Sequence, residues 1–138
     1  MILVYMMTWS DEYKIGLPVI DSQHKRLFNL IDELNEAIET GLEIKDVEKL
    51  FAGLKQYTTR HFQLEEKYMM ESNYPGLEEQ QKSHDYFSKK FIALGNEIGE
   101  GSIKPTVIQT IKEELAQWLK GHVTGLDVKF GEYYLQQK

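Results

Sequence analysis

The sequence holds four histidines, and each lies in a different run of apolar residues that repeat with helical spacing. They are His24, His61, His84 and His122. A single histidine on an apolar helix face is usually a core residue that hydrogen-bonds to a neighbour. Four such residues, one for each helix, are hard to satisfy in this way, and helical bundles build metal and cofactor sites from facing helices. The pattern therefore predicts a buried metal site.

Two carboxylates accompany these histidines. Glu65 follows His61 by four residues, which places both side chains on one helix face. Asp127 follows His122 by five residues, which is a rotation of about 140° on an ideal α-helix. On that geometry the two do not share a face. Asp127 reaches the site only from a neighbouring part of the core, or if Gly125 loosens the helix.

The number of candidate ligands indicates how many metal ions the site would hold and of which kind. Four imidazoles and two carboxylates are too many for one tetrahedral zinc and are enough for two metal ions bridged by carboxylates. Ferritin-like sites hold two metals with four glutamates and two histidines. A site richer in histidine is less negative, so it favours ferrous iron and the binding of dioxygen. Manganese and zinc remain alternatives.

Gln80 lies four residues before His84 in the stretch EEQQKSH, so the two side chains share a helix face. Gln80 is either a polar residue on a solvated face or a residue that stands where a metal ligand belongs. The flanking Glu78 and Glu79 point away from that face, and we expect them to be solvated.

The apolar periodicity predicts an all-α protein with no sheet. The expected helices span residues of about 22–40, 46–71, 77–99 and 105–124, with a short helical segment at about 126–136. Asp21 or Ser22 and Asp46 are the expected N-caps, Gly41 the expected end of the first helix, and Pro105 an expected first helical residue. Helices of this length joined by short loops predict an antiparallel up-down-up-down four-helix bundle in a single domain, residues 1–138. Residues 1–20 are expected to form an extended N-terminal arm across it.

Composition excludes several classes of function. The net charge of −6 argues against nucleic acid as the main partner. The absence of cysteine excludes disulfides, iron–sulfur clusters and a cysteine nucleophile. The apolar first residues are too few to span a bilayer and lack the features of a signal peptide, so we expect a cytoplasmic protein without membrane insertion.

The sequence resembles the hemerythrins, specifically the short bacterial ones, over essentially its whole length. The family has a histidine early in the first helix, HxxxE in the second, HxxxH in the third and HxxxxD in the fourth. The corresponding stretches here are DSQH, HFQLEE, QQKSH and HVTGLD. The tryptophan of the arm, the NYP turn and the WL before His122 also match.

The resemblance implies a centre of two iron ions. His24 and His61 would ligate the iron that has the open position for dioxygen, and His84 and His122 the other iron. Glu65 and Asp127 would bridge the two ions, together with an oxide or hydroxide. The residues expected to line an apolar oxygen pocket, which could equally be plain core, are Phe28, Phe62, Trp118, Leu119 and Val123.

The sequence departs from the family at one ligand, because Gln80 stands where the family has its fifth histidine. Its amide oxygen could ligate the second iron, it could hydrogen-bond a water that fills the position, or the second iron could bind poorly. The implied function is reversible dioxygen binding for storage, delivery or sensing, and so not an enzyme in the strict sense. The alternatives are a di-iron peroxidase-like or nitric-oxide-handling protein that uses the position vacated at Gln80, and a metal-free interaction module. The partner protein stays unknown.

Overall fold

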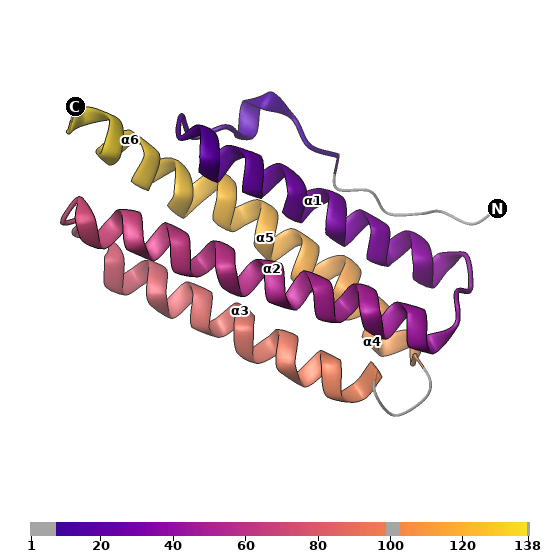
Figure 1. Ribbon diagram of the computed structural model, residues 1–138. Coiled ribbons are helices and arrows are strands. Elements are labelled where there is room, and N and C mark those ends of the chain that lie inside the picture. Colours follow the sequence, from indigo (N-terminus) through magenta and orange to yellow (C-terminus); the bar gives the residue numbers. More distant parts are fainter. Residues whose placement is uncertain (1–7, 99–102, 138) are drawn as a thin grey trace.

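In the computed structural model, which describes residues 8–98 and 103–137, every regular element is helical. The first three long helices are α1 (Pro18–Glu39), α2 (Ile44–Glu71) and α3 (Leu77–Ile98). They pack with a fourth helical stretch as an antiparallel up-down-up-down bundle, which confirms the expected fold class (Figure 1). None of the described helices combines the length and the apolar composition needed to cross a bilayer.

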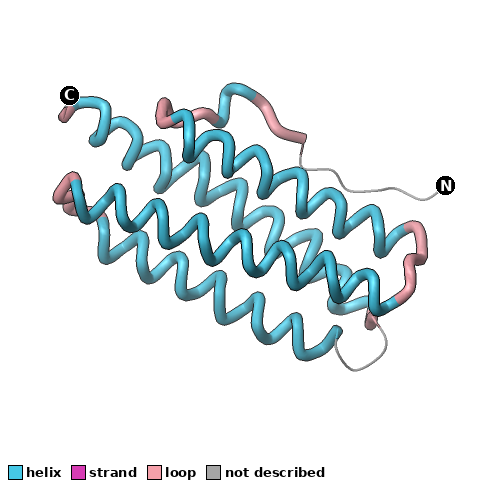
Figure 2. Tube along the Cα trace, viewed as in Figure 1, coloured by secondary structure: helices cyan, strands magenta, loops and turns pink. Residues whose placement is uncertain are grey.

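The fourth stretch is continuous from Pro105 to Gln136 and contains two π-helical segments. In chain order it consists of α4 (Pro105–Gln109), the π-segment η2 (Thr110–Leu115), α5 (Ala116–His122), the π-segment η3 (Val123–Asp127) and α6 (Val128–Gln136). The expected break between residues 124 and 126 was therefore wrong. No proline follows Pro105, and the backbone absorbs the irregularity as a wider helical turn instead of a loop (Figure 2).

The first two helices begin earlier than expected. Helix α1 begins at Pro18, whose fixed φ suits a first helical position, and α2 begins at Ile44. The expected N-caps are therefore wrong: Asp21 and Ser22 lie inside α1, and Asp46 lies in the first turn of α2. The carboxylate of Asp21 instead accepts hydrogen bonds from the backbone N–H groups of Ile15, at 2.7 Å, and Gly16, at 3.2 Å.

Gly41 ends α1 as expected. Its φ of +76° lies in the left-handed region that glycine adopts without strain. The N–H of Leu42 donates to the carbonyl of Ala37, and that of Gly41 to Ile38, which is the Schellman arrangement. At the same end of the bundle, α3 extends through Ile98, and residue 99, the expected last residue, lies outside the described part.

Residues 8–17 form an arm that runs along α1 and contains the short 3₁₀ helix η1 (Asp11–Tyr13) (Figure 1). The first seven residues of the expected arm lie outside the described part, and residues 18–20 belong to α1. Trp9 and Tyr13 pack against Phe28, with ring centroids 5.3 and 5.6 Å away. Through Trp9 and Tyr13 the arm is therefore attached to the core at Phe28.

The arm also passes very close to α6. A Cβ atom built on Gly131 would lie 2.5 Å from the carbonyl oxygen of Ile15 and 2.8 Å from its Cβ. We expect Gly131→Ala to lower the free energy of unfolding by about 1–3 kcal/mol, because the arm must move away. Gly53→Ala is the matched control, since a Cβ atom at Gly53 would meet nothing within 4 Å. This substitution should raise the free energy of unfolding by about 0.5–1 kcal/mol. Urea unfolding of both metal-free variants measures this, and a stabilised Gly131→Ala would contradict it.

Candidate metal centre

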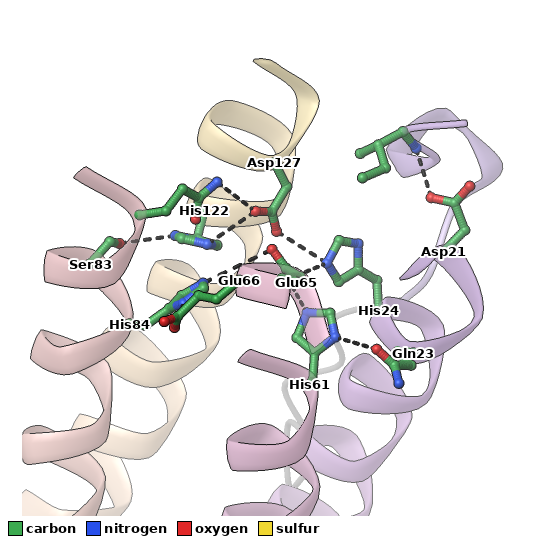
Figure 3. Close-up of polar contacts among 12 residues, drawn as sticks. Asp21, Gln23, His24, His61, Glu65, Glu66, Ser83, His84, His122 and Asp127 are labelled. Atoms are coloured by element: carbon green, nitrogen blue, oxygen red, sulfur yellow. Dashed lines mark hydrogen bonds and ion pairs between the residues drawn. The ribbon is translucent and has the colours of Figure 1, made fainter. Parts of the chain in front are cut away.

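The four histidines come from four helical stretches and converge on one layer of the bundle (Figure 3). His24 lies on α1, His61 on α2, His84 on α3 and His122 at the end of α5, and all four are buried. Each occupies the apolar face of its helix, so the packing that forms the core also brings the imidazoles together. Glu65 and Asp127 lie in the same layer and are fully buried.

The π-segment η3 decides the position of Asp127. The segment spans Val123–Asp127, directly after His122. A π-helix bonds residues five apart, so a residue at i+5 lies nearly above residue i. Asp127 therefore shares the inward face with His122, and Asp127 Oδ1 lies 3.2 Å from His122 Nε2. Of the two routes expected for Asp127, the structure shows the loosened helix, with Gly125 inside η3.

Each carboxylate directs its two oxygens toward different histidine pairs. Glu65 Oε1 lies 3.2 Å from His24 Nε2 and also contacts His61 Nε2, while Glu65 Oε2 lies 3.9 Å from His84 Nε2. Asp127 Oδ2 lies 3.1 Å from His24 Nε2, and Asp127 Oδ1 faces His122. Both carboxylates therefore stand between a His24/His61 side and a His84/His122 side.

The cluster has the composition of two adjacent metal sites. His24, His61, Glu65 and Asp127 bring their ligand atoms within 4.8 Å of one another, and so do Glu65, His84 and His122. Several of these buried atoms make no hydrogen bond, namely Glu65 Oε2, His84 Nε2, His122 Nε2 and Asp127 Oδ2. The last two are only within ion-pair distance of Asp127 Oδ1 and His24 Nε2. Buried polar atoms without partners are costly, whereas buried charges that coordinate metals are satisfied. The donor set therefore fits a pair of metal ions that share the carboxylates.

Three residues outside the cluster orient the rings by holding their Nδ1 atoms. His61 Nδ1 donates to Gln23 Oε1 at 2.7 Å, and His84 Nδ1 donates to Glu66 Oε2 at 2.8 Å. Ser83 Oγ lies 2.9 Å from His122 Nδ1. An Nδ1 held in this way leaves Nε2 for the metal. The sequence reasoning missed these three, although each lies next in sequence to a candidate ligand.

The charged groups shift one another's protonation. Burial by itself lowers the pKa of His24, but the carboxylates of Asp127 and Glu65 outweigh it and raise this pKa to about 10. Burial raises the pKa of Glu65, but His61 and His24 hold it well below its usual range. Burial lowers the pKa of His84. Burial also acts to lower the pKa of His122, but the carboxylates of Asp127 and Glu65 together outweigh it, and this pKa is raised. Metal ions would displace the extra protons that the raised pKa values favour on His24 and His122.

Aromatic rings enclose the His84/His122 side. Phe62 stacks on His84 with a centroid distance of 3.9 Å, and Trp118 stacks on His122 at 4.7 Å. Of the expected pocket residues, Phe28, Phe62, Leu119 and Val123 are buried in the main apolar core, and Trp118 packs against it partly buried. The structure thus places Phe62 and Trp118 beside the histidines that the resemblance assigns to the second iron.

Gln80 belongs to the cluster and not to the surface. Its side chain is only 1% exposed, whereas Glu78 and Glu79 are exposed as expected. Its Nε2 donates to Asp127 Oδ1 at 3.0 Å, and its Oε1 is buried without a hydrogen-bond partner. The reading of Gln80 as an ordinary solvated residue is therefore wrong.

Comparison with known proteins identifies the family. Residues 16–131 match the family described as the hemerythrin HHE cation binding domain. Bacteriohemerythrin from Stenotrophomonas maltophilia (strain R551-3) is 27% identical over 127 residues, which cover 92% of this chain and 80% of that protein. Myohemerythrin from Riftia pachyptila is 27% identical over 122 residues, which cover 88% of each chain.

A solved structure agrees at the level of the fold. The crystal structure of wild-type hemerythrin superposes with a TM-score of 0.79 at 22% identity, covering 92% of this chain and 96% of that one. A bundle of four helices, a buried layer of histidines and carboxylates and a family match over most of the chain lead to one assignment. The chain belongs to the hemerythrin family, whose members are non-haem iron proteins that bind dioxygen.

Proposed function

We propose that this protein holds two iron ions and binds dioxygen reversibly, for storage, delivery or sensing. The observation that carries the proposal is the placement of Glu65 and Asp127, each with one oxygen toward the His24/His61 side and the other toward the His84/His122 side. Carboxylates in that position are suited to bridging two metal ions.

The proposal assigns His24 and His61 to one iron and His84 and His122 to the other. Glu65 and Asp127 would bridge them, with an oxide or hydroxide as a third bridge. Iron, when bound, supplies the redox chemistry that dioxygen requires. The protein supplies the ligand geometry, through the residues that hold the Nδ1 atoms, and an environment from which water is excluded.

The apolar shell explains why binding would be reversible. Phe28, Leu119 and Val123 are at most 1% exposed and belong to the main core. A dry pocket keeps water and protons away from a bound oxygen molecule, and so it slows the loss of electrons from the metal. We propose these residues as the lining of the oxygen pocket, with Phe62 and Trp118 continuing it toward His84 and His122.

An optical experiment tests this function. The iron-loaded protein is reduced without air, exposed to oxygen and then depleted of oxygen, while the visible spectrum is followed. We expect an absorption band that appears with oxygen and disappears on its removal over several cycles. A single irreversible change to the ferric spectrum would contradict reversible binding.

Peroxidase-like chemistry or nitric oxide handling is the second candidate function, and Gln80 favours it. With an amide in place of an imidazole, the His84/His122 side has one imidazole donor fewer than the family pattern. If the optical cycle is irreversible, rapid reaction of the reduced protein with hydrogen peroxide or nitric oxide would support this candidate. Gln80→His should then slow that reaction.

A further inference from the structure

We propose that the His84/His122 side of the centre carries a second position for a small exogenous ligand, lined by Gln80. In this arrangement Gln80 is a positioning residue for Asp127 and does not ligate the metal. The inference rests on the proposed di-iron site, and it adds a ligand position to the one that the family resemblance implies beside His24 and His61.

The hydrogen bond to Asp127 fixes the orientation of the Gln80 amide. Gln80 Nε2 lies 3.0 Å from Asp127 Oδ1, and a carboxylate oxygen only accepts hydrogen bonds. The reversed amide would place two acceptor oxygens at that distance, which is repulsive. Only the oxygen of an amide is a metal donor, so the end of Gln80 that faces the bridging carboxylate is the end that cannot ligate.

When Gln80 is not a ligand, the two sides of the centre have equal sets of protein donors for a metal ion. One side has two imidazoles, His24 and His61, and the other has His84 and His122. Glu65 and Asp127 contribute one oxygen to each side. Non-haem iron held by two histidines and few other protein ligands keeps open positions for exogenous ligands. If the metal on the His24/His61 side has an open coordination position, the metal on the His84/His122 side should have one too, because its set of protein donors is equal.

The remaining end of the amide indicates which ligands fit. Gln80 Oε1 is a buried acceptor without a hydrogen-bond partner, which is a costly arrangement. A small ligand that carries a proton, such as water or hydrogen peroxide, would donate to this oxygen. We therefore assign the position to water in the resting protein. On ferric iron, whose charge attracts anions, a small anion would replace that water.

A groove leads from solvent toward this side of the centre. It lies between α2 and α3, has a volume of about 420 Å³, and includes Phe62, Glu66 and His84 in its lining. Glu66, which accepts the hydrogen bond from His84 Nδ1, is partly exposed there. Small movements of Phe62 and Glu66 would open a route for a ligand of two or three atoms.

Counting bound azide tests the inference, because azide is a small anion that replaces water on ferric iron. The oxidised, iron-loaded protein is titrated by calorimetry, and its iron content is measured on the same sample. We expect two azide ions per iron pair in the native sequence and one in Gln80→His, where the new imidazole would fill the position. Gln56→His, which adds a histidine at an exposed position of α2, should bind two.

Gln80→Leu separates the two roles of the amide. If Gln80 only positions Asp127, the leucine variant binds two azide ions, as the native sequence does. Two iron ions but a single azide in the native sequence, rising to two in Gln80→Leu, would show that the amide ligates iron and would overturn the inference. One azide in both proteins would overturn it as well. Fewer than two iron ions in the native sequence would instead contradict the proposed di-iron function.

Discussion

Replacing Glu65 by alanine should reduce the metal content from the proposed two iron ions to at most one per chain. Glu65 belongs to both groups of ligand atoms, with one oxygen near His24 and His61 and the other facing His84. Its loss removes a donor and a negative charge from both sides of the centre. Loss of a residue that only orients a ligand costs about 10–100-fold in metal affinity, so we expect more than about 100-fold here.

Metal analysis after desalting, together with competition against a chelator, measures this effect. Glu65→Gln keeps the volume of the side chain and separates the loss of charge from the loss of packing, and it should also lose metal. Glu66→Ala should lose an intermediate amount of metal, since Glu66 touches the cluster only through its hydrogen bond with His84 Nδ1. Glu78→Ala, at an exposed position, should keep its metal. Two tightly held iron ions in Glu65→Gln would refute the bridging role.

Phe28→Ala should lower the free energy of unfolding by about 3–5 kcal/mol, which is the usual cost of emptying the site of a buried phenylalanine. Phe28 is completely buried and is the side chain on which Trp9 and Tyr13 of the arm pack. The variant therefore loses the contacts in the core and weakens the attachment of the arm. We also expect faster oxidation of the reduced protein in air, because water gains access to the region next to His24.

Urea unfolding of the metal-free protein measures the stability separately from the metal, and the rate of spectral change in air measures the oxidation. Phe28→Leu should lose much less stability because it leaves a smaller cavity. Tyr86→Ala is the matched surface control, since Tyr86 is 55% exposed, and it should change stability by less than about 0.5 kcal/mol. A loss below about 1 kcal/mol in Phe28→Ala would mean that the arm and the core do not depend on this ring.

The bundle and the layer of histidines follow from local patterns in the sequence. Apolar residues at helical spacing determine which face of each helix turns inward, and His24, His61, His84 and His122 share those faces. Glu65 follows by the same rule, because a spacing of four residues keeps one face in an ordinary α-helix. Periodicity is enough for these five residues, since it needs no knowledge of what lies opposite.

The first residues of the helices were harder to predict, because a side chain that could cap a helix can also hydrogen-bond to other backbone groups nearby. Asp21 has the right residue type for an N-cap and directly precedes the helix expected from residue 22. Its carboxylate instead binds the backbone of Ile15 and Gly16, and α1 begins at Pro18. The position of the arm gives Asp21 these partners, and the sequence of α1 alone does not contain that information.

Tertiary structure decided the parts of the centre that depend on neighbours from other helices. Asp127 faces His122 only because η3 is π-helical, and ideal α-helical geometry would have turned it away. Gln80 was visible in the sequence as an unusual residue, but its hydrogen bond to Asp127 joins residues that lie 47 positions apart. Spacing along one helix tells which face a side chain occupies. Which atom it meets there depends on how the other helices pack against that face.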